Sequence, residues 1–263
     1  MNTYFNINYE MDKAKVHKSI SDVISREGKG YICVADGVVM NTANRNKEYL
    51  DVVNGGMFAI CDSGWVPLYL KSIYGIKYEQ YCGAEIFKDI VSSRKYRMIF
   101  MGTHQRTLDA LQSELAKTIN PDVKEMSFVE LPFKDVKDFD YQEIAKMIED
   151  DGARIIWVAL GAPKQERFMN NLLPYLKTGV LLGVGAVFKF YSGTEEKRCP
   201  EWLQKHHMEF LYRIWQDPKK QIKRCFWIVA TLPKLYIEEK RRANNKFYEG
   251  NRYDSTMKVS EDL

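Results

Sequence analysis

The sequence predicts an α/β fold, with a doubly wound, mainly parallel sheet of the Rossmann-like type and a helical, basic C-terminal appendage. The first observation is a series of short, almost uninterrupted apolar runs, which are typical of parallel strands buried on both faces. The second is that a glycine or polar turn, and then a helical pattern, follows most of these runs. Such alternation favours right-handed crossovers in which helices cover both faces of one sheet.

The clearest strand, turn and helix unit starts with the apolar run at residues 155–160. This run stops at Gly161, and Gly161 and Pro163 predict a tight turn before a helical pattern that opens at Lys164. Free backbone N–H groups and the helix dipole at such a junction favour an anionic ligand, for which the diphosphate of a nucleotide is the obvious candidate. The alternative is an ordinary junction without a ligand, because any such junction can carry Gly and Pro.

The remaining elements follow from the same patterns. Predicted strands cover residues 31–35, 38–40, 57–61, 97–101, 128–131 and 180–184. Predicted helices cover residues 12–26, 107–119 and 141–149, and two more follow the strands at residues 38–40 and 57–61. A chain of 263 residues that is 45% hydrophobic can bury the core of one large domain, residues 1–211, beside an appendage at residues 212–263.

Cysteine usage and hydropathy limit the class of protein. The five cysteines are odd in number, widely spaced and without a CxxC pair, so neither a disulfide framework nor a zinc site is predicted. A reducing cytoplasm is the economical interpretation. The N-terminus lacks the apolar region of a secretory signal, and no run reaches the about 20 apolar residues of a membrane-spanning helix. We therefore expect a soluble or peripheral protein with no metal site.

Polar residues directly after predicted strands are the candidates for chemistry. Asp62 and Gly64 follow one such strand, where a carboxylate lies on the rim of the ligand crevice and glycine lets the backbone approach closely. Asp62 is the first candidate for catalysis, and the alternative is that it caps the helix that follows. Thr42 and Asn44 are expected where the strand at residues 38–40 gives way to a helix, so they either cap that helix or face a ligand.

The C-terminal part of the chain is strongly basic. Residues 213–246 carry ten Lys or Arg against three acids, interleaved with tryptophan, phenylalanine, tyrosine and aliphatic residues. A basic, aromatic-rich amphipathic segment suits an anionic membrane surface. The alternatives are a helix packed on its own domain or on another subunit, and a homo-oligomer could bury the apolar stripe. A basic face could also attract nucleic acid, but no RNA- or DNA-binding motif occurs, so we expect no nucleic-acid partner.

Three motifs resemble one known family. Residues 160–169, LGAPKQERFM, resemble the GxPxQE signature of the WecG/TagA/CpsF glycosyltransferases. Asp62-Ser63-Gly64 is similar to the aspartate and glycine of that family's DG motif. Residues 198–224, RCPEWLQKHHMEFLYRIWQDPKKQIKR, are similar to its RAPxW segment and the ExxYR and basic stretch that follow. The motifs stand in the family's order, and the resemblance covers about residues 31–224.

The resemblance implies an inverting hexosyltransferase that needs neither a metal nor another cofactor. Its donor is a UDP-sugar carrying an N-acetylhexosamine, which is N-acetylmannosamine in the best-known members. Its acceptor is a polyprenyl-diphosphate-linked N-acetylglucosamine, used in the synthesis of bacterial surface polysaccharide or teichoic acid. The family acts in the cytoplasm, as a peripheral protein on the inner face of the cell membrane.

The resemblance also implies roles for single residues. Asp62 matches the proposed general base, which takes the proton of the acceptor hydroxyl. Thr42, Asn44 and Gln165 match pocket positions, and Arg213 and Arg224 match basic residues of the appendage. The residues expected to bind substrate are Thr42, Asn44, Gly64, Gly161, Pro163, Gln165, Glu166, Gly185, Arg198, Arg213 and Arg224.

Other functions stay open on the sequence alone. A dinucleotide-binding oxidoreductase could use a similar sheet, although no GxGxxG followed by a suitably spaced acid occurs. A catalytically silent nucleotide-binding or membrane-associated protein is a further alternative, which the presence of Asp62 and Gln165 disfavours. Among transferases, the donor could be another UDP-hexose.

Overall fold

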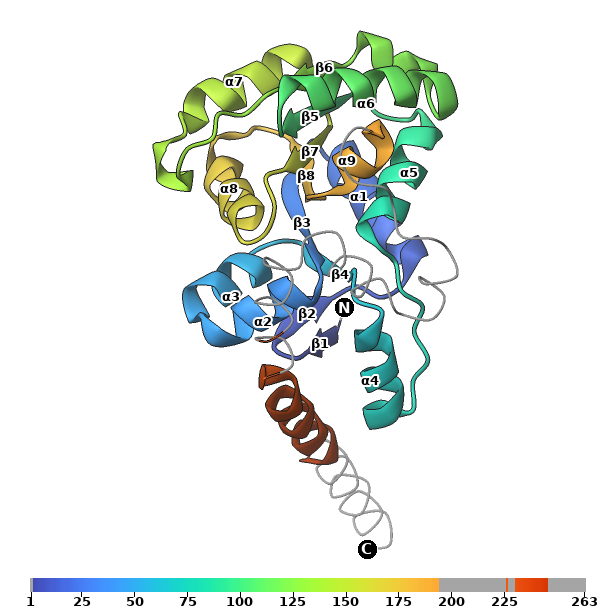
Figure 1. Cartoon of the computed structure of the whole chain (residues 1–263), viewed down its shortest axis with the longest axis vertical. Coiled ribbons are helices and arrows are strands. Elements are labelled where there is room, and N and C mark those ends of the chain that lie inside the picture. The colour runs from blue at the N-terminus through green and yellow to red at the C-terminus, as the bar shows by residue number, and fades with distance from the viewer. Residues whose placement is uncertain (1, 194–225, 227–229, 246–263) are drawn as a thin grey trace, which may run out of the picture.

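The structure of the protein, a computed structural model, describes residues 2–193, 226 and 230–245. Figure 1 shows a central sheet with helices on both sides, and a further helix, residues 230–245, at one end of the molecule. We call this the C-terminal helix. The predicted domain boundary at residues 211 and 212, and the predicted site residues Arg198, Arg213 and Arg224, lie outside the described residues.

The described strands form one sheet in the order β1-β2-β4-β3-β8-β7-β5-β6. β1 and β2 form an antiparallel hairpin, whereas the other neighbouring pairs are parallel. From β3 the chain adds β4 on one side and then crosses to β5 on the other, which opens a crevice at the carboxyl ends of the central strands. The strands are β1(Asn2–Tyr4), β2(Ile7–Tyr9), β3(Lys29–Ala35), β4(Phe58–Cys61), β5(Met98–Gly102), β6(Ser127–Val129), β7(Ile155–Ala159) and β8(Gly179–Gly183).

Helices cover both faces of this sheet (Figure 1). Alternate strand residues face opposite sides, so Ile156 and Val158 of β7 join one apolar cluster while Ile155 and Trp157 join the other. The first cluster is closed by α2, α3, α4, α7 and α8, and the second by α1, α5, α6 and α9. β3, β4, β5, β7 and β8, which coincide with predicted apolar runs, are therefore strands with both faces buried, whereas the edge strand β6 is half-buried.

The helices are as follows. The α-helices are α1(Lys13–Ser25), α2(Gly37–Arg45), α3(Lys47–Asn54), α4(Trp65–Tyr74), α5(Gly83–Ser93), α6(Gln105–Thr118), α7(Tyr141–Asp151), α8(Lys164–Leu172) and α9(Val187–Ser192). Short 3₁₀ helices are η1(Pro121–Glu125), η2(Val136–Asp138) and η3(Leu173–Tyr175).

The predicted α/β sheet is confirmed, and one predicted strand is wrong. Residues 38–40 lie inside α2, because Asp36 Oδ1 accepts hydrogen bonds from the N–H groups of Val38 and Val39 and so starts a helix there. Thr42 and Asn44 consequently lie within α2 and not at a strand–helix junction. The hairpin of β1 and β2 and the helices α5 and α9 are further elements that the apolar-run pattern did not reveal.

The C-terminal helix packs on its own domain, which is one of the alternatives open from the sequence. Leu235 is buried, and the Glu239 carboxylate is only 1% exposed. Glu239 accepts hydrogen bonds from Phe5 N at 2.9 Å and from the Tyr74 hydroxyl at 2.6 Å, and it pairs with Arg242 at 3.1 Å. This helix is therefore fixed to both the N-terminal hairpin and α4.

Candidate active site

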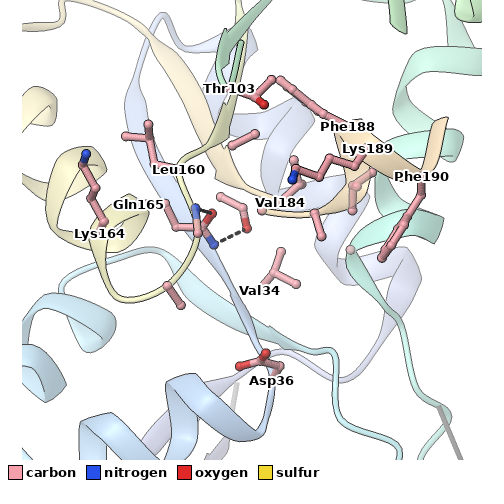
Figure 2. A pocket seen from close by; sticks show the side chains of 18 of the residues that line it. Val34, Asp36, Thr103, Leu160, Lys164, Gln165, Val184, Phe188, Lys189 and Phe190 are labelled. Atoms are coloured by element: carbon pink, nitrogen blue, oxygen red, sulfur yellow. Dashed lines mark hydrogen bonds between the residues drawn. The ribbon is translucent and has the colours of Figure 1, made fainter. Parts of the chain in front are cut away.

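A pocket of about 510 Å³ opens at the carboxyl ends of the central strands. The segments that follow β3, β4, β5, β7 and β8 contribute its lining, and Figure 2 shows the side chains around it. This is the position at which an open parallel sheet binds ligands, because the chain reverses its direction of winding there. Of the predicted site residues, the pocket contains Asp62, Gly161, Gln165 and Gly185.

The loop after β7 is held by the side chain of Gln165. Its Oε1 accepts a hydrogen bond from Gly161 N at 3.2 Å, and its Nε2 donates to the carbonyl oxygen of Gly183 at 3.1 Å. Gly161 adopts a φ of 76°, in the left-handed region that glycine tolerates best. One amide therefore ties the end of β7 to the end of β8, as the dashed lines in Figure 2 mark in part. Gln165 lines the pocket and also shapes it.

Glu166 lies behind this loop and is fully buried. Its Oε1 accepts a second hydrogen bond from Gln165 Nε2 at 2.9 Å, and its Oε2 accepts one from the Tyr49 hydroxyl at 3.0 Å. Burial, partly offset by these hydrogen bonds, raises the pKa of Glu166 to about 7. Glu166 therefore holds the Gln165 side chain in place. Its carboxylate contacts Tyr49 and Gln165 and does not line the pocket.

Asp62 follows β4 and is partly buried in the pocket lining. Its Oδ1 accepts a hydrogen bond from Gly83 N, the first residue of α5, at 2.8 Å, and its carbonyl oxygen accepts one from Gln80 Nε2 at 3.0 Å. Gly64 is the N-cap of α4. The expected alternative, in which Asp62 caps the helix directly after it, is therefore wrong: the carboxylate is oriented by α5 and stays beside the pocket.

The pocket lining contains further charged residues that were not predicted from the sequence. Asp36 follows β3 just as Asp62 follows β4, so the same rule, a polar residue directly after a buried strand, could have found it. Lys164 and Lys189 come from α8 and α9, after β7 and β8, and Figure 2 shows Lys189 extending into the pocket. Asp36 and Asp62 therefore come from the segments after β3 and β4, and the two lysines come from the helices after β7 and β8.

The side of the pocket formed by β5 and β6 carries a histidine and an exposed aromatic residue. His104 Nδ1 lies 3.5 Å from a carboxylate oxygen of Glu130, whose other oxygen accepts a hydrogen bond from Gln105 N. Phe133 is completely exposed, and the Lys164 ammonium lies 5.0 Å from the centre of its ring. An aromatic ring and a cation at the mouth of one pocket suit a ligand with both a planar base and negative charge.

The remaining predicted site residues lie elsewhere. Asn44 donates hydrogen bonds to the carbonyl oxygens of Phe5 and Met40 and accepts one from Asn6 Nδ2, so it connects α2 to the N-terminal hairpin. Thr42, on the same helix, is also absent from the pocket lining, and so are Gly64 and Pro163. Their role in binding stays a prediction. Arg198, Arg213 and Arg224 lie outside the described residues.

The part of the chain that the structure describes contains neither a candidate metal-binding cluster nor a membrane-spanning helix. There, His, Cys, Asp and Glu side chains do not gather in any group of three that could hold a metal ion. None of the described helices combines the length and the apolarity needed to traverse a bilayer.

The model of one protein family, described as "Glycosyl transferase WecG/TagA/CpsF family", matches residues 3–246 of the chain, including the pocket and its Gly161 loop. The match spans most of the chain. The chain belongs to this family. Its three motifs therefore occur in a WecG/TagA/CpsF glycosyltransferase, and the structure brings two of them, the Asp62 motif and the Gly161 loop, to one pocket.

Two relatives of this WecG/TagA/CpsF protein carry the same name, N-acetylglucosaminyldiphosphoundecaprenol N-acetyl-beta-D-mannosaminyltransferase. The relative from Bacillus subtilis (strain 168) is 25% identical over 257 residues, which cover 93% of this chain and 96% of the relative. The relative from Bacillus spizizenii (strain ATCC 23059 / NRRL B-14472 / W23) is 26% identical over 199 residues, which cover 74% of each chain.

Proposed function

We propose that this protein transfers N-acetylmannosamine from a UDP-sugar to an undecaprenyl-diphosphate-linked N-acetylglucosamine, with inversion at the transferred carbon. The observation that carries the proposal is the position of Asp62, a carboxylate that is oriented by Gly83 N and lines the same pocket as the Gly161 loop, Lys164 and Lys189. The names of the Bacillus relatives support the choice of donor and acceptor. The product would serve the synthesis of teichoic acid or another surface polysaccharide.

The geometry supports a division of roles across the pocket. Asp62 takes the proton of the acceptor hydroxyl as that oxygen bonds to the anomeric carbon of the sugar. The bond between this carbon and the diphosphate breaks on the opposite side, and UDP leaves with the electron pair. Backbone N–H groups near Gly161 and Gly185 and the ammonium groups of Lys164 and Lys189 stabilise the negative charge on UDP. The reaction then needs neither a metal nor another cofactor.

The site residues outside the described part of the chain complete the proposal. Arg198, Arg213 and Arg224 match basic positions of the family, and we assign them to the diphosphates of the two substrates. Thr42 and Asn44 lie on α2, outside the pocket lining, so their assignment to substrate binding rests on the family match alone. The protein would work in the cytoplasm, as a peripheral protein on the inner face of the membrane, where the lipid-linked acceptor lies. A homo-oligomer is part of the same proposal.

The decisive experiment measures release of UDP from UDP-N-acetylmannosamine in the presence of the lipid-linked acceptor. Asp62→Asn should lower kcat about 10²- to 10⁴-fold, because a general base is lost. The fold should survive, because the asparagine oxygen can still accept the hydrogen bond from Gly83 N. Asp140→Asn is the matched control, since Asp140 caps α7 and does not line the pocket.

Each outcome of this experiment has a clear meaning. Full activity in the Asp62→Asn variant would remove Asp62 from catalysis. A panel of UDP-hexoses and UDP-N-acetylhexosamines with one acceptor tests the donor, and faster turnover with another UDP-hexose would overturn the assignment to N-acetylmannosamine. Binding of UDP without transfer of any sugar would instead support a catalytically silent protein.

A further inference from the structure

Apolar side chains are exposed at the end of the molecule that carries α4 and the C-terminal helix. Trp65 and Leu68 of α4 are 45% and 41% exposed, and Ile237 of the C-terminal helix is 50% exposed. Figure 1 shows these two helices together at one end of the molecule, away from α6 and α7. Exposed apolar side chains that cluster on neighbouring helices mark a surface that binds something apolar.

Aromatic contacts join the two helices into one surface. The rings of Trp65 and Tyr69 stack with centroids 6.5 Å apart, and the Tyr69 ring meets the Tyr236 ring edge-on at 5.8 Å. The Tyr236 and Ser72 hydroxyls lie 2.8 Å apart in a hydrogen bond. The buried Glu239 adds the hydrogen bond from Tyr74 that fixes the same two helices. The surface is therefore preformed.

The charges around this surface are mainly positive. Lys234 and Arg241 lie three residues before and four residues after Ile237, so the helical period places all three side chains on one outer face. α4 carries Lys71 and no acid. Glu238 is the exposed acid of the described C-terminal helix, and it pairs with Lys234 at 3.8 Å. Tryptophan with leucine, isoleucine and basic side chains is the composition that favours the interface of an anionic bilayer.

The surface is also close to the proposed catalytic carboxylate. Trp65 is the first residue of α4 and follows Asp62 by three residues, so their Cα atoms are at most about 11 Å apart. A bilayer in contact with Trp65 would therefore lie near the part of the pocket that holds Asp62. A lipid-linked acceptor would reach the carboxylate without leaving the membrane interface.

We propose that α4 is a membrane-contacting helix, in which Trp65 and Leu68 enter the interface of an anionic bilayer beside Ile237 of the C-terminal helix. The inference rests on the proposed function for the identity of the acceptor. It goes beyond that function, and beyond the basic segment at residues 213–246, in assigning lipid contact to α4 as well. A second copy of the chain could cover the same apolar side chains, but the positive charge around them favours an anionic surface over an identical, equally positive one.

The test is binding of the full chain to phosphatidylglycerol vesicles, measured by sedimentation. The double variant Trp65→Ser and Leu68→Ser should bind these vesicles at least about tenfold more weakly, because two apolar side chains are lost from the interface. Met147→Ser with Tyr175→Ser is the matched control, since these side chains are 38% and 47% exposed on α7 and η3. The control should bind as the parent does, and binding of the parent should weaken with salt.

Transfer assays separate this inference from the proposed function. The Trp65 and Leu68 double variant should transfer sugar more slowly to the undecaprenyl-linked acceptor in vesicles and at the parental rate to a water-soluble, short-chain acceptor. If the parent transfers sugar to neither acceptor, the proposed function fails, while vesicle binding still tests the role of α4. Unchanged vesicle binding in the double variant, or an equal loss in the control, overturns the inference. A change of oligomeric state in the double variant alone, with vesicle binding unchanged, would assign the surface to a second copy.

Discussion

Glu166 predicts an unusual dependence of stability on pH. Burial raises the pKa of this carboxyl from its ordinary 4.5 to about 7, so the folded protein binds a proton at pH values where the unfolded chain has lost it. Lowering the pH therefore favours the folded state, and the gain develops between pH 7 and pH 4.5. The effect is opposite in sign to that of a salt-bridged carboxylate, whose pKa falls on folding.

The size of this effect follows from proton linkage. A pKa that rises from 4.5 to about 7 adds about 2 kcal/mol to the free energy of unfolding when the pH falls from about 8 to about 5.5. Glu166→Gln removes the titrating group while keeping its shape, so this share of the pH dependence should disappear. Any constant change caused by the new amide beside Tyr49 and Gln165 is the same at both pH values and drops out of the difference.

The measurement is urea unfolding of the parent and of Glu166→Gln at these two pH values. Glu114→Gln, which replaces an exposed carboxylate of α6, controls for the loss of one acid from the chain. We expect the parent and Glu114→Gln to gain stability together on acidification, and Glu166→Gln to gain about 2 kcal/mol less. If all three proteins respond equally to pH, Glu166 does not titrate in this range and the reasoning is refuted.

Two further predictions concern single side chains that join distant segments. Gln165→Ala removes three hydrogen bonds, from Gly161 N and to Glu166 and Gly183, each worth about 1 kcal/mol. Calorimetry should show that the melting temperature falls by about 5 to 10 °C. Kinetic assays should show a higher KM for the UDP-sugar. An unchanged melting temperature would show that the Gln165 amide does not hold the loop. Glu239→Ala leaves Phe5 N and the Tyr74 hydroxyl without their acceptor, so it should lower the free energy of unfolding by at least about 2 kcal/mol and speed proteolysis at Arg241. Glu238→Ala, at the exposed neighbour, should do neither, and equal proteolysis of the two variants would contradict this role of Glu239.

The parallel sheet and the place of its pocket could be predicted from the sequence because both depend on local patterns. A run such as residues 155–160 is apolar at every position, and this marks a strand buried on both faces wherever it lies in the chain. A glycine or an acid directly after such a run must lie at the edge where parallel strands end. Asp62 and Gly161 were identified by this rule, and the same rule extends to Asp36. The strand predicted at residues 38–40 failed because three apolar residues fit a helix equally well once Asp36 caps it.

Contacts between residues far apart in the sequence were decided by tertiary structure alone. Asn44 is of a residue type that often binds ligands or caps helices. Its side-chain amide instead forms hydrogen bonds with Phe5 and Asn6, in a hairpin whose packing no local sequence pattern specifies. Glu239 lies in a basic segment whose sequence suggests an exposed helix. Its carboxylate is nevertheless buried, and it accepts hydrogen bonds from Tyr74 and from Phe5 N, which is 234 residues away. The sequence by itself therefore determined the buried parallel strands, the polar residues that follow them and the family. Only the folded chain decided which polar side chains face the pocket and which are used to join its walls, because a hydrogen bond between distant segments exists only when packing brings donor and acceptor together.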